Sequence, residues 1–74
     1  MNIRPRYTSP YSDLISAIAP GYDPRHIEAY MRLEHSTLDG LTRDQFEFEV
    51  AIGVACINEG GIDAAERCAQ SYGM

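Results

Sequence analysis

The chain has 74 residues, of which 45% are hydrophobic, and a formal charge of −5 with arginine as its only strongly basic residue type. This length fits one domain near the lower limit for a self-sufficient core, and the apolar content is too high for a disordered chain. The longest apolar run, residues 50–57, is too short to span a bilayer, and the acidic balance disfavours phosphate backbones and favours basic partners.

Residues 1–8 are expected to form a flexible arm ahead of a single helical domain over residues 9–74. Pro5 and its neighbours discourage a helix, and the arm lacks the apolar stretch of a signal peptide, so a cytoplasmic location is expected. A frayed terminus is one reading of this segment. In the other reading, its basic and aromatic side chains are candidates for contacting an acidic protein surface: Arg4, Arg6 and Tyr7.

A short helix is predicted over residues 9–19. Ser9 can cap its first turn, and Pro10 fits the first helical position. Pro20 and Gly21 should end it. The apolar side chains that share its inner face are Tyr11, Leu14, Ile15 and Ile18.

A second helix is predicted from Asp23-Pro24, which repeats the same start signal, to about His35. Glu28 and Arg32 lie four residues apart and are expected to pair on its outer face. Its expected inner face consists of Ile27, Tyr30, Met31 and Leu33, with Ala29 at the edge. Leu38 is expected to tuck under the loop that follows.

Residues 43–58, RDQFEFEVAIGVACIN, are predicted to form the central apolar helix of a small all-α bundle of three to four helices. Thr42 and Gln45 can form a capping box at its start. At 100° per residue the apolar side chains fall into two stripes, with Glu49 between them. The first stripe consists of Phe46, Val50, Gly53, Val54 and Ile57. The second stripe consists of Phe48, Ile52, Ala55 and Cys56.

The first stripe is expected to be core, with Val50 and Ile57 almost fully buried. The second stripe has two readings that the sequence leaves open, either core under the first and last helices or an interface. In the second reading Phe48, Ile52 and Glu49 belong to a protein-binding surface, and a two-fold homodimer is the expected assembly.

Gly60 and Gly61 should end the central helix, one of them in the left-handed conformation, and Asp63 is expected to cap a last helix. Small residues on one face of that helix allow a close approach, with Gly53 as a candidate contact. The two cysteines, Cys56 and Cys68, are expected to be reduced thiols in the packed core, as is usual in a cytosolic chain.

No motif for catalysis or cofactor binding is recognisable in the sequence. His26 and His35 are nine residues apart and belong to no HExxH or CxxC pattern, so structural roles are expected for both. No nucleophile motif or phosphate-binding glycine loop is present. We therefore expect no enzymatic activity, no cofactor and no metal site.

Direct nucleic-acid binding is not expected either. If residues 43–58 served as the recognition helix of a helix-turn-helix, they would present Asp44, Glu47 and Glu49 to the bases. Basic or amide side chains are needed there.

Residues 25–74 resemble small uncharacterised helical proteins of temperate phages and prophages of proteobacteria. The stretches that carry this resemblance are HIEAYMRLEHSTLDGL, QFEFEVAIGVACINEGG and AAERCAQSYG. The resemblance implies a phage or prophage setting, in which small proteins often act by binding a host protein. The expected function is a non-enzymatic protein-binding accessory module that acts stoichiometrically on a host or phage protein. The alternative is a small regulator acting on nucleic acid or on a nucleic-acid-binding protein.

Overall fold

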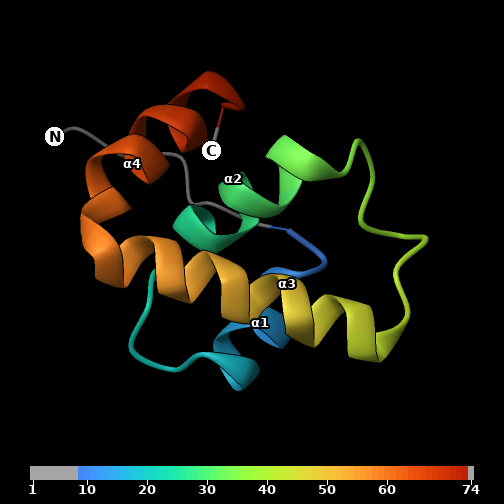
Figure 1. Cartoon of the computed structure of the whole chain (residues 1–74). Helices are drawn as coiled ribbons and strands as arrows, with labels where there is room; N and C mark the ends of the chain where they lie inside the picture. Colours follow the sequence, from blue (N-terminus) through green and yellow to red (C-terminus); the bar gives the residue numbers. More distant parts are fainter. Residues whose placement is uncertain (1–8, 74) are drawn as a thin grey trace, which may run out of the picture.

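The computed structural model describes residues 9–73, which form four α-helices, a kinked turn between the last two and no strand. The helices are α1 (Ser12–Ile18), α2 (Pro24–Glu34), α3 (Arg43–Cys56) and α4 (Ile62–Ser71), and the turn η1 (Ile57–Gly61) joins α3 directly to α4 (Figure 1). The expected small all-α bundle is confirmed. The expected arm at residues 1–8 lies outside the described residues.

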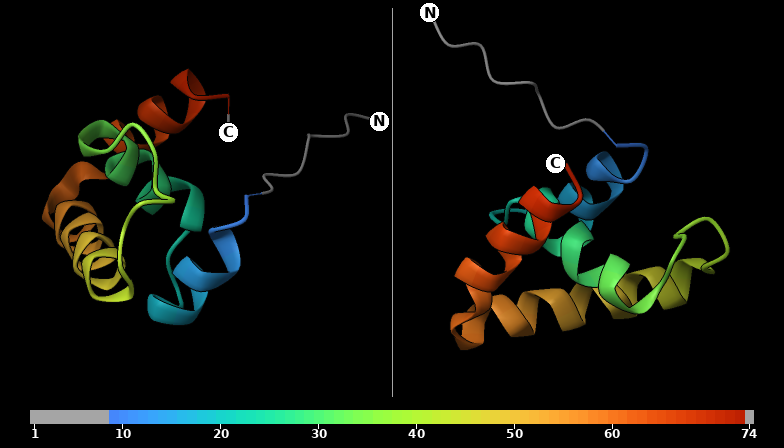
Figure 2. Two further views of the ribbon diagram at one scale, coloured as in Figure 1. Left: turned by 90° about the vertical axis from the view of Figure 1, so that its right-hand side faces the viewer. Right: turned by 90° about the horizontal axis from the view of Figure 1, so that it is seen from above.

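Helix α2 packs against each of the other three helices. α3 and α4 diverge from η1, and α2 lies in the angle between them (Figure 2). α1 packs against both α2 and α3 and closes the remaining side of the core. The predicted helix over residues 43–58 is thus present as α3 and the start of η1, while the helix that contacts all the others is α2.

The start of α2 follows the predicted signal. The side chain of Asp23 accepts a hydrogen bond from the Arg25 backbone N–H at 3.0 Å, and Pro24 occupies the first helical position. Ile27 and Met31 are buried in the core. Leu33, expected on the inner face, is instead 58% exposed, because it borders a groove between α2 and α4 that neither helix fills.

Glu28 is the main departure from the expected pattern of α2. It pairs with Arg32 as predicted, at 2.9 Å between Oε2 and Nη2, but it is fully buried and not on an outer face. The expectation was wrong because α2 is surrounded on three sides, so a position that would face solvent on a surface helix is enclosed here. A buried carboxylate needs charged or hydrogen-bonding partners, and Arg32 supplies one of them.

Helix α3 begins with the expected capping box, in which Thr42 and Gln45 each accept a hydrogen bond from the other's backbone N–H. Its first stripe faces the core, and Val50 is 1% exposed as predicted. Ile57 is only half-buried, which corrects the expectation for that residue, because it lies in η1 at the margin of the core. The buried core cluster consists of Ile15, Ala19, Ile27, Met31, Leu38, Phe46 and Val50.

A tight corner connects α3 to α4. Gly60 adopts a φ of 96°, the left-handed conformation expected for one of the two glycines. The Tyr30 hydroxyl of α2 donates a hydrogen bond to the Gly61 carbonyl oxygen at 2.6 Å, which ties the corner to α2. Asp63 does not cap α4 as predicted, since the helix continues from the corner and Asp63 already lies within its first turn.

Small side chains allow α4 to approach α2 closely. Ala29 of α2 and Ala65 and Ala69 of α4 are all fully buried. The expected contact between Gly53 and the last helix is wrong, because the Cα of Gly53 faces Ile27 of α2. α4 therefore docks on α2 and leaves the outer side of α3 free.

Helix α1 starts at Ser12, two residues after Pro10, which was predicted as the first helical position. The Ser9 hydroxyl accepts a hydrogen bond from the Tyr11 backbone N–H at 3.1 Å, so Ser9 stabilises a turn that precedes the helix. Ile15 is fully buried, and Leu38 packs under the loop as expected. Within residues 9–73, no helix has both the length and the apolar character needed to cross a membrane.

Candidate functional site

The outer face of α3 carries apolar side chains that the rest of the described chain does not cover. Phe48 is 65% exposed, Ala51 and Ala55 are exposed, and Ile52 is half-buried. These four residues follow one another at helical spacing along α3, and we call them the α3 face. The second stripe of the sequence pattern is therefore not enclosed by α1 and α4, which pack mainly on α2.

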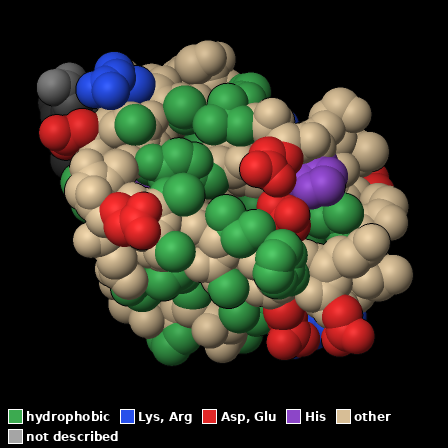
Figure 3. All heavy atoms as spheres, in the orientation of Figure 1, with side chains coloured by type: hydrophobic (Ala, Val, Ile, Leu, Met, Phe, Trp, Pro, Cys, Tyr) green, Lys and Arg blue, Asp and Glu red, His purple; other side chains and the backbone are tan. Residues whose placement is uncertain are grey.

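Acidic side chains accompany the α3 face. Asp44 and Glu47 are exposed in its first turns, and Glu47 pairs with Arg43 at 2.7 Å. Glu59 is exposed in η1, beyond the other end of α3. Figure 3 shows hydrophobic side chains spread over this side of the molecule with acidic groups among them. The surface thus combines apolar area with negative charge.

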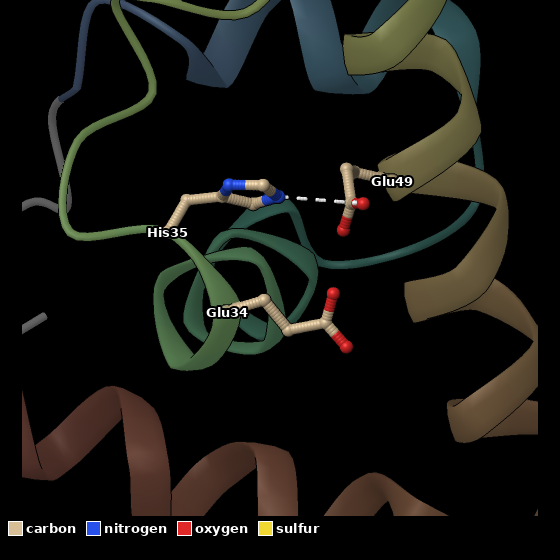
Figure 4. Close-up of side chains that lie close together, drawn as sticks. All are labelled: Glu34, His35 and Glu49. Atoms are coloured by element: carbon tan, nitrogen blue, oxygen red, sulfur yellow. Dashed lines mark ion pairs between the residues drawn. The ribbon is translucent and has the colours of Figure 1, made fainter.

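A cluster of three potential metal ligands lies where the end of α2 meets α3. Glu34, His35 and Glu49 each offer one ligand atom, and the three atoms lie within 4.8 Å of one another. Figure 4 shows that all three side chains point into the same space, two from α2 and its end and one from α3. We call this set the Glu–His–Glu cluster.

The ring nitrogen of His35 is the unusual atom of this cluster. Nε2 is buried and lies 3.4 Å from Glu49 Oε1, but no hydrogen bond of acceptable geometry reaches it from the described residues. The Glu49 side chain is largely enclosed, with an exposed fraction of 12%, whereas the His35 side chain as a whole is 31% exposed. Buried polar atoms without a hydrogen-bond partner are rare in folded proteins.

Local structure explains how the cluster forms. His35 ends α2, with its backbone N–H bonded to the Met31 carbonyl oxygen at 3.0 Å and its own backbone extended. Glu49 projects from the second turn of α3, between the two apolar stripes. Sequence reasoning missed this cluster because it searched for ligands within one helix. The available signal was the adjacent pair Glu34-His35 at a helix end, but its partner depends on how α2 and α3 pack.

A second charged cluster joins the start of α2 to α4. Glu66 pairs with Arg25, and His26 Nε2 lies 2.8 Å from the same carboxylate oxygen. The Arg25 guanidinium, helped by His26, lowers the pKa of Glu66 to about 2. This carboxylate is therefore ionised at neutral pH and already engaged by a resident cation.

A shallow groove of about 260 Å³ lies between α2 and α4. Its lining residues are Leu33, Ala64, Arg67, Cys68, Ser71 and Tyr72. Both cysteines are free thiols, as expected. Their position corrects the sequence expectation, because Cys56 and Cys68 are half-buried and not in the packed core.

The structure separates the residues that the sequence grouped as a protein-binding surface. Phe48 and Ile52 lie on the α3 face, whereas Glu49 is enclosed beside His35. The other three candidates, Arg4, Arg6 and Tyr7, lie outside the described residues. Comparisons with protein-family models, with curated proteins and with solved structures gave no significant match. The function is therefore argued from the residues of this chain.

Proposed function

We propose that this chain is a non-enzymatic protein-binding module that acts stoichiometrically through the α3 face. The observation that carries the proposal is the 65% exposure of Phe48 at the N-terminal end of an apolar stripe on a helix whose other side is core. Single exposed apolar residues are common on protein surfaces. A row of four at helical spacing on one helix is instead typical of an interaction site.

The spacing of the α3 face fits one recognition mode. Phe48, Ile52 and Ala55 occupy positions i, i+4 and i+7, which are the anchor positions of a helix that lies in a groove of its partner. Aromatic anchors contribute strongly to binding free energy when they enter a pocket. Phe48 is the largest side chain of the stripe and is expected to be this anchor.

The negative charge beside the α3 face indicates what kind of protein would bind there. Asp44 and Glu47 flank the α3 face, and the whole chain carries a charge of −5. The fitting partner is a protein with an apolar groove bordered by arginine or lysine side chains, since complementary charges steer association and exclude wrong partners. The same acidic flank opposes binding to a phosphate backbone. The phage or prophage setting, with a host or phage protein as the target, belongs to this proposal.

The experiment compares two glutamate substitutions at apolar positions of similar exposure, 65% for Phe48 and 58% for Leu33. Phe48→Glu alters the α3 face, whereas Leu33→Glu alters the groove between α2 and α4. Tagged wild type and both variants are used to capture proteins from host lysate, and the captured protein is then titrated against each variant in purified form. We expect the wild type and Leu33→Glu to bind one copy of the same protein, and Phe48→Glu to lose at least tenfold in affinity, or about 1.4 kcal/mol.

Equal binding by Phe48→Glu and the wild type would reject the α3 face as the contact surface. Light scattering at micromolar concentration tests the other expected occupant, a second copy of the chain. A dimer that Phe48→Glu converts into a folded monomer would assign the α3 face to self-association and not to a foreign partner.

A further inference from the structure

We propose that the Glu–His–Glu cluster binds a divalent transition metal ion, with Zn²⁺ as the best fit. Glu34 and Glu49 would each supply a carboxylate oxygen and His35 its Nε2 atom. Imidazole selects transition metals over Mg²⁺ and Ca²⁺, and a mixed nitrogen and oxygen set is common for Zn²⁺. Three protein ligands leave one position of a tetrahedral site open to water or to a side chain of a bound partner.

The geometry supports this ion. In a tetrahedral site with Zn–N and Zn–O bonds of about 2.0–2.2 Å, neighbouring ligand atoms lie about 3.3–3.5 Å apart. His35 Nε2 and Glu49 Oε1 are 3.4 Å apart, which matches one edge of such a tetrahedron without any movement. Glu34 is exposed at the end of α2, so a rotamer change can bring its carboxylate to the third corner.

The buried Nε2 atom of His35 gives an independent argument for metal binding. Its Nε2 atom is buried, and none of the described residues forms a hydrogen bond with it. A neutral imidazole whose proton is on Nδ1 presents a lone pair at Nε2, which is the form that binds a metal ion. Coordination would satisfy an atom that has an ion-pair contact with Glu49 at 3.4 Å but no hydrogen bond from the described residues.

Electrostatics favour a cation at this place. The cluster contains two carboxylates, and no arginine of residues 9–73 pairs with either of them. It also lies at the C-terminal end of α2, where the helix dipole attracts positive charge. The cluster of His26 and Glu66 differs because Arg25 already occupies its carboxylate, so we expect no metal ion there.

The test is a titration of metal-free protein with Zn²⁺, followed by calorimetry at neutral pH. We expect one ion per chain in the wild type and at least a tenfold loss of affinity in His35→Gln and Glu49→Gln, since even changes in the residues that support metal ligands cost about 10–100-fold. Two matched controls should bind within twofold of the wild type. Glu47→Gln makes the same charge change two residues away on α3, and His26→Gln replaces the other histidine.

Further measurements test the proposal even if a variant of one of the three proposed metal-binding residues is poorly folded. Glu34 is exposed, so Glu34→Gln should keep the wild-type melting temperature without metal and still weaken Zn²⁺ binding several-fold. In NMR spectra of the wild type, Zn²⁺ should shift the ring signals of His35 and leave those of His26 unchanged. Mg²⁺ should not compete.

Three outcomes would overturn the proposal. The first is no Zn²⁺ binding by the wild type at millimolar concentration. The second is the same affinity in the wild type, Glu34→Gln, His35→Gln and Glu49→Gln. The third is binding that disappears in Cys68→Ala while His35→Gln retains it, which would place the ion at a thiol.

Discussion

At the scale of single residues, the Glu28–Arg32 pair has a close counterpart in the same molecule. Arg43 and Glu47 form an ion pair with the same spacing on α3, but both side chains are about half exposed or more, whereas Glu28 is buried. An ion pair on the surface contributes little to stability, but a buried carboxylate is destabilising when it loses a charged partner. Comparing the two ion pairs therefore shows the effect of burial on stability at the same sequence spacing.

We expect Arg32→Ala to lower the free energy of unfolding by about 1–3 kcal/mol, because it removes a charged hydrogen-bond donor from the buried Glu28 carboxylate. Arg43→Ala is the matched control and should cost about 0–1 kcal/mol. Urea unfolding at neutral pH measures both. Equal losses in the two variants would mean that the burial of Glu28 has no energetic consequence.

A second prediction at the scale of single residues concerns the stability of the fold at acidic pH. The pKa of Glu66 is lowered from 4.5 to about 2 by Arg25 and then His26, so its ionised form stabilises the folded state. That contribution is complete above pH 4.5 and is lost as the pH falls from 4.5 to about 2. Glu66→Gln should therefore be less stable than the wild type at neutral pH, and the difference should shrink through this window.

Thermal unfolding of both proteins across that pH range measures the effect. Glu59→Gln is the control, because Glu59 is exposed in η1 and forms none of the ion pairs found in residues 9–73. Its stability should follow the wild type at every pH. A constant gap between Glu66→Gln and the wild type would show that the Arg25 contact does not depend on the charge of Glu66.

At the scale of helices and turns, the predicted start signals were correct for α2 and α3 and wrong for α1 and α4, where neither Ser9 nor Asp63 caps the helix. Asp23, Thr42 and Gln45 act as predicted because a cap depends only on residues within one turn. The burial of Glu28 and the meeting of His35 with Glu49 depend on how separate helices are placed. A hydrophobic period of 3.6 residues shows which residues share one face of a helix, but it does not show how many other helices pack around it. Helical periodicity and helix-end signals could therefore predict the all-α class but not the candidate metal cluster.

The corner between α3 and α4 leads to a prediction about how the turn between two helices affects stability. A Cβ atom on Gly61 would lie 2.7 Å from the Cys56 carbonyl oxygen and would also collide with the Tyr30 hydroxyl. Gly61→Ala should cost about 1–3 kcal/mol, because the corner must shift to remove the overlap. Gly40→Ala is the control, since a Cβ atom on Gly40, in the loop before α3, would have no other atom within 4 Å.

We expect Gly40→Ala to change the free energy of unfolding by no more than about 0.5 kcal/mol. Chemical unfolding followed by circular dichroism measures both variants. If Gly61→Ala were as stable as the wild type, the Tyr30 hydrogen bond to Gly61 could not be fixing the corner.

At the scale of the whole molecule, α3 has one side that the fold requires and one that it does not. Val50 is 1% exposed in a core shared by α1, α2 and α3, whereas Phe48 is on the α3 face two residues away. Val50→Asp would bury an unpaired charge at a cost of several kcal/mol, comparable with the whole stability of a small domain. We expect Val50→Asp to be unfolded and Phe48→Glu to remain helical with a cooperative thermal transition.

Far-UV circular dichroism during heating distinguishes these outcomes. A folded Val50→Asp variant would contradict the core described above. Loss of the cooperative transition in Phe48→Glu would show that the α3 face supports the fold and is not available for binding.

The two connections that flank α3 should respond differently to changes in chain length. η1 joins α3 to α4 through a tight corner at Gly60, and one added residue there would shift and rotate α4 relative to α2. Ala65 and Ala69 would then rotate away from α2. The segment between α2 and α3 contains exposed residues such as Gly40, where extra length can bulge into solvent. Insertions and deletions in evolution are therefore expected near Gly40 and not at the corner.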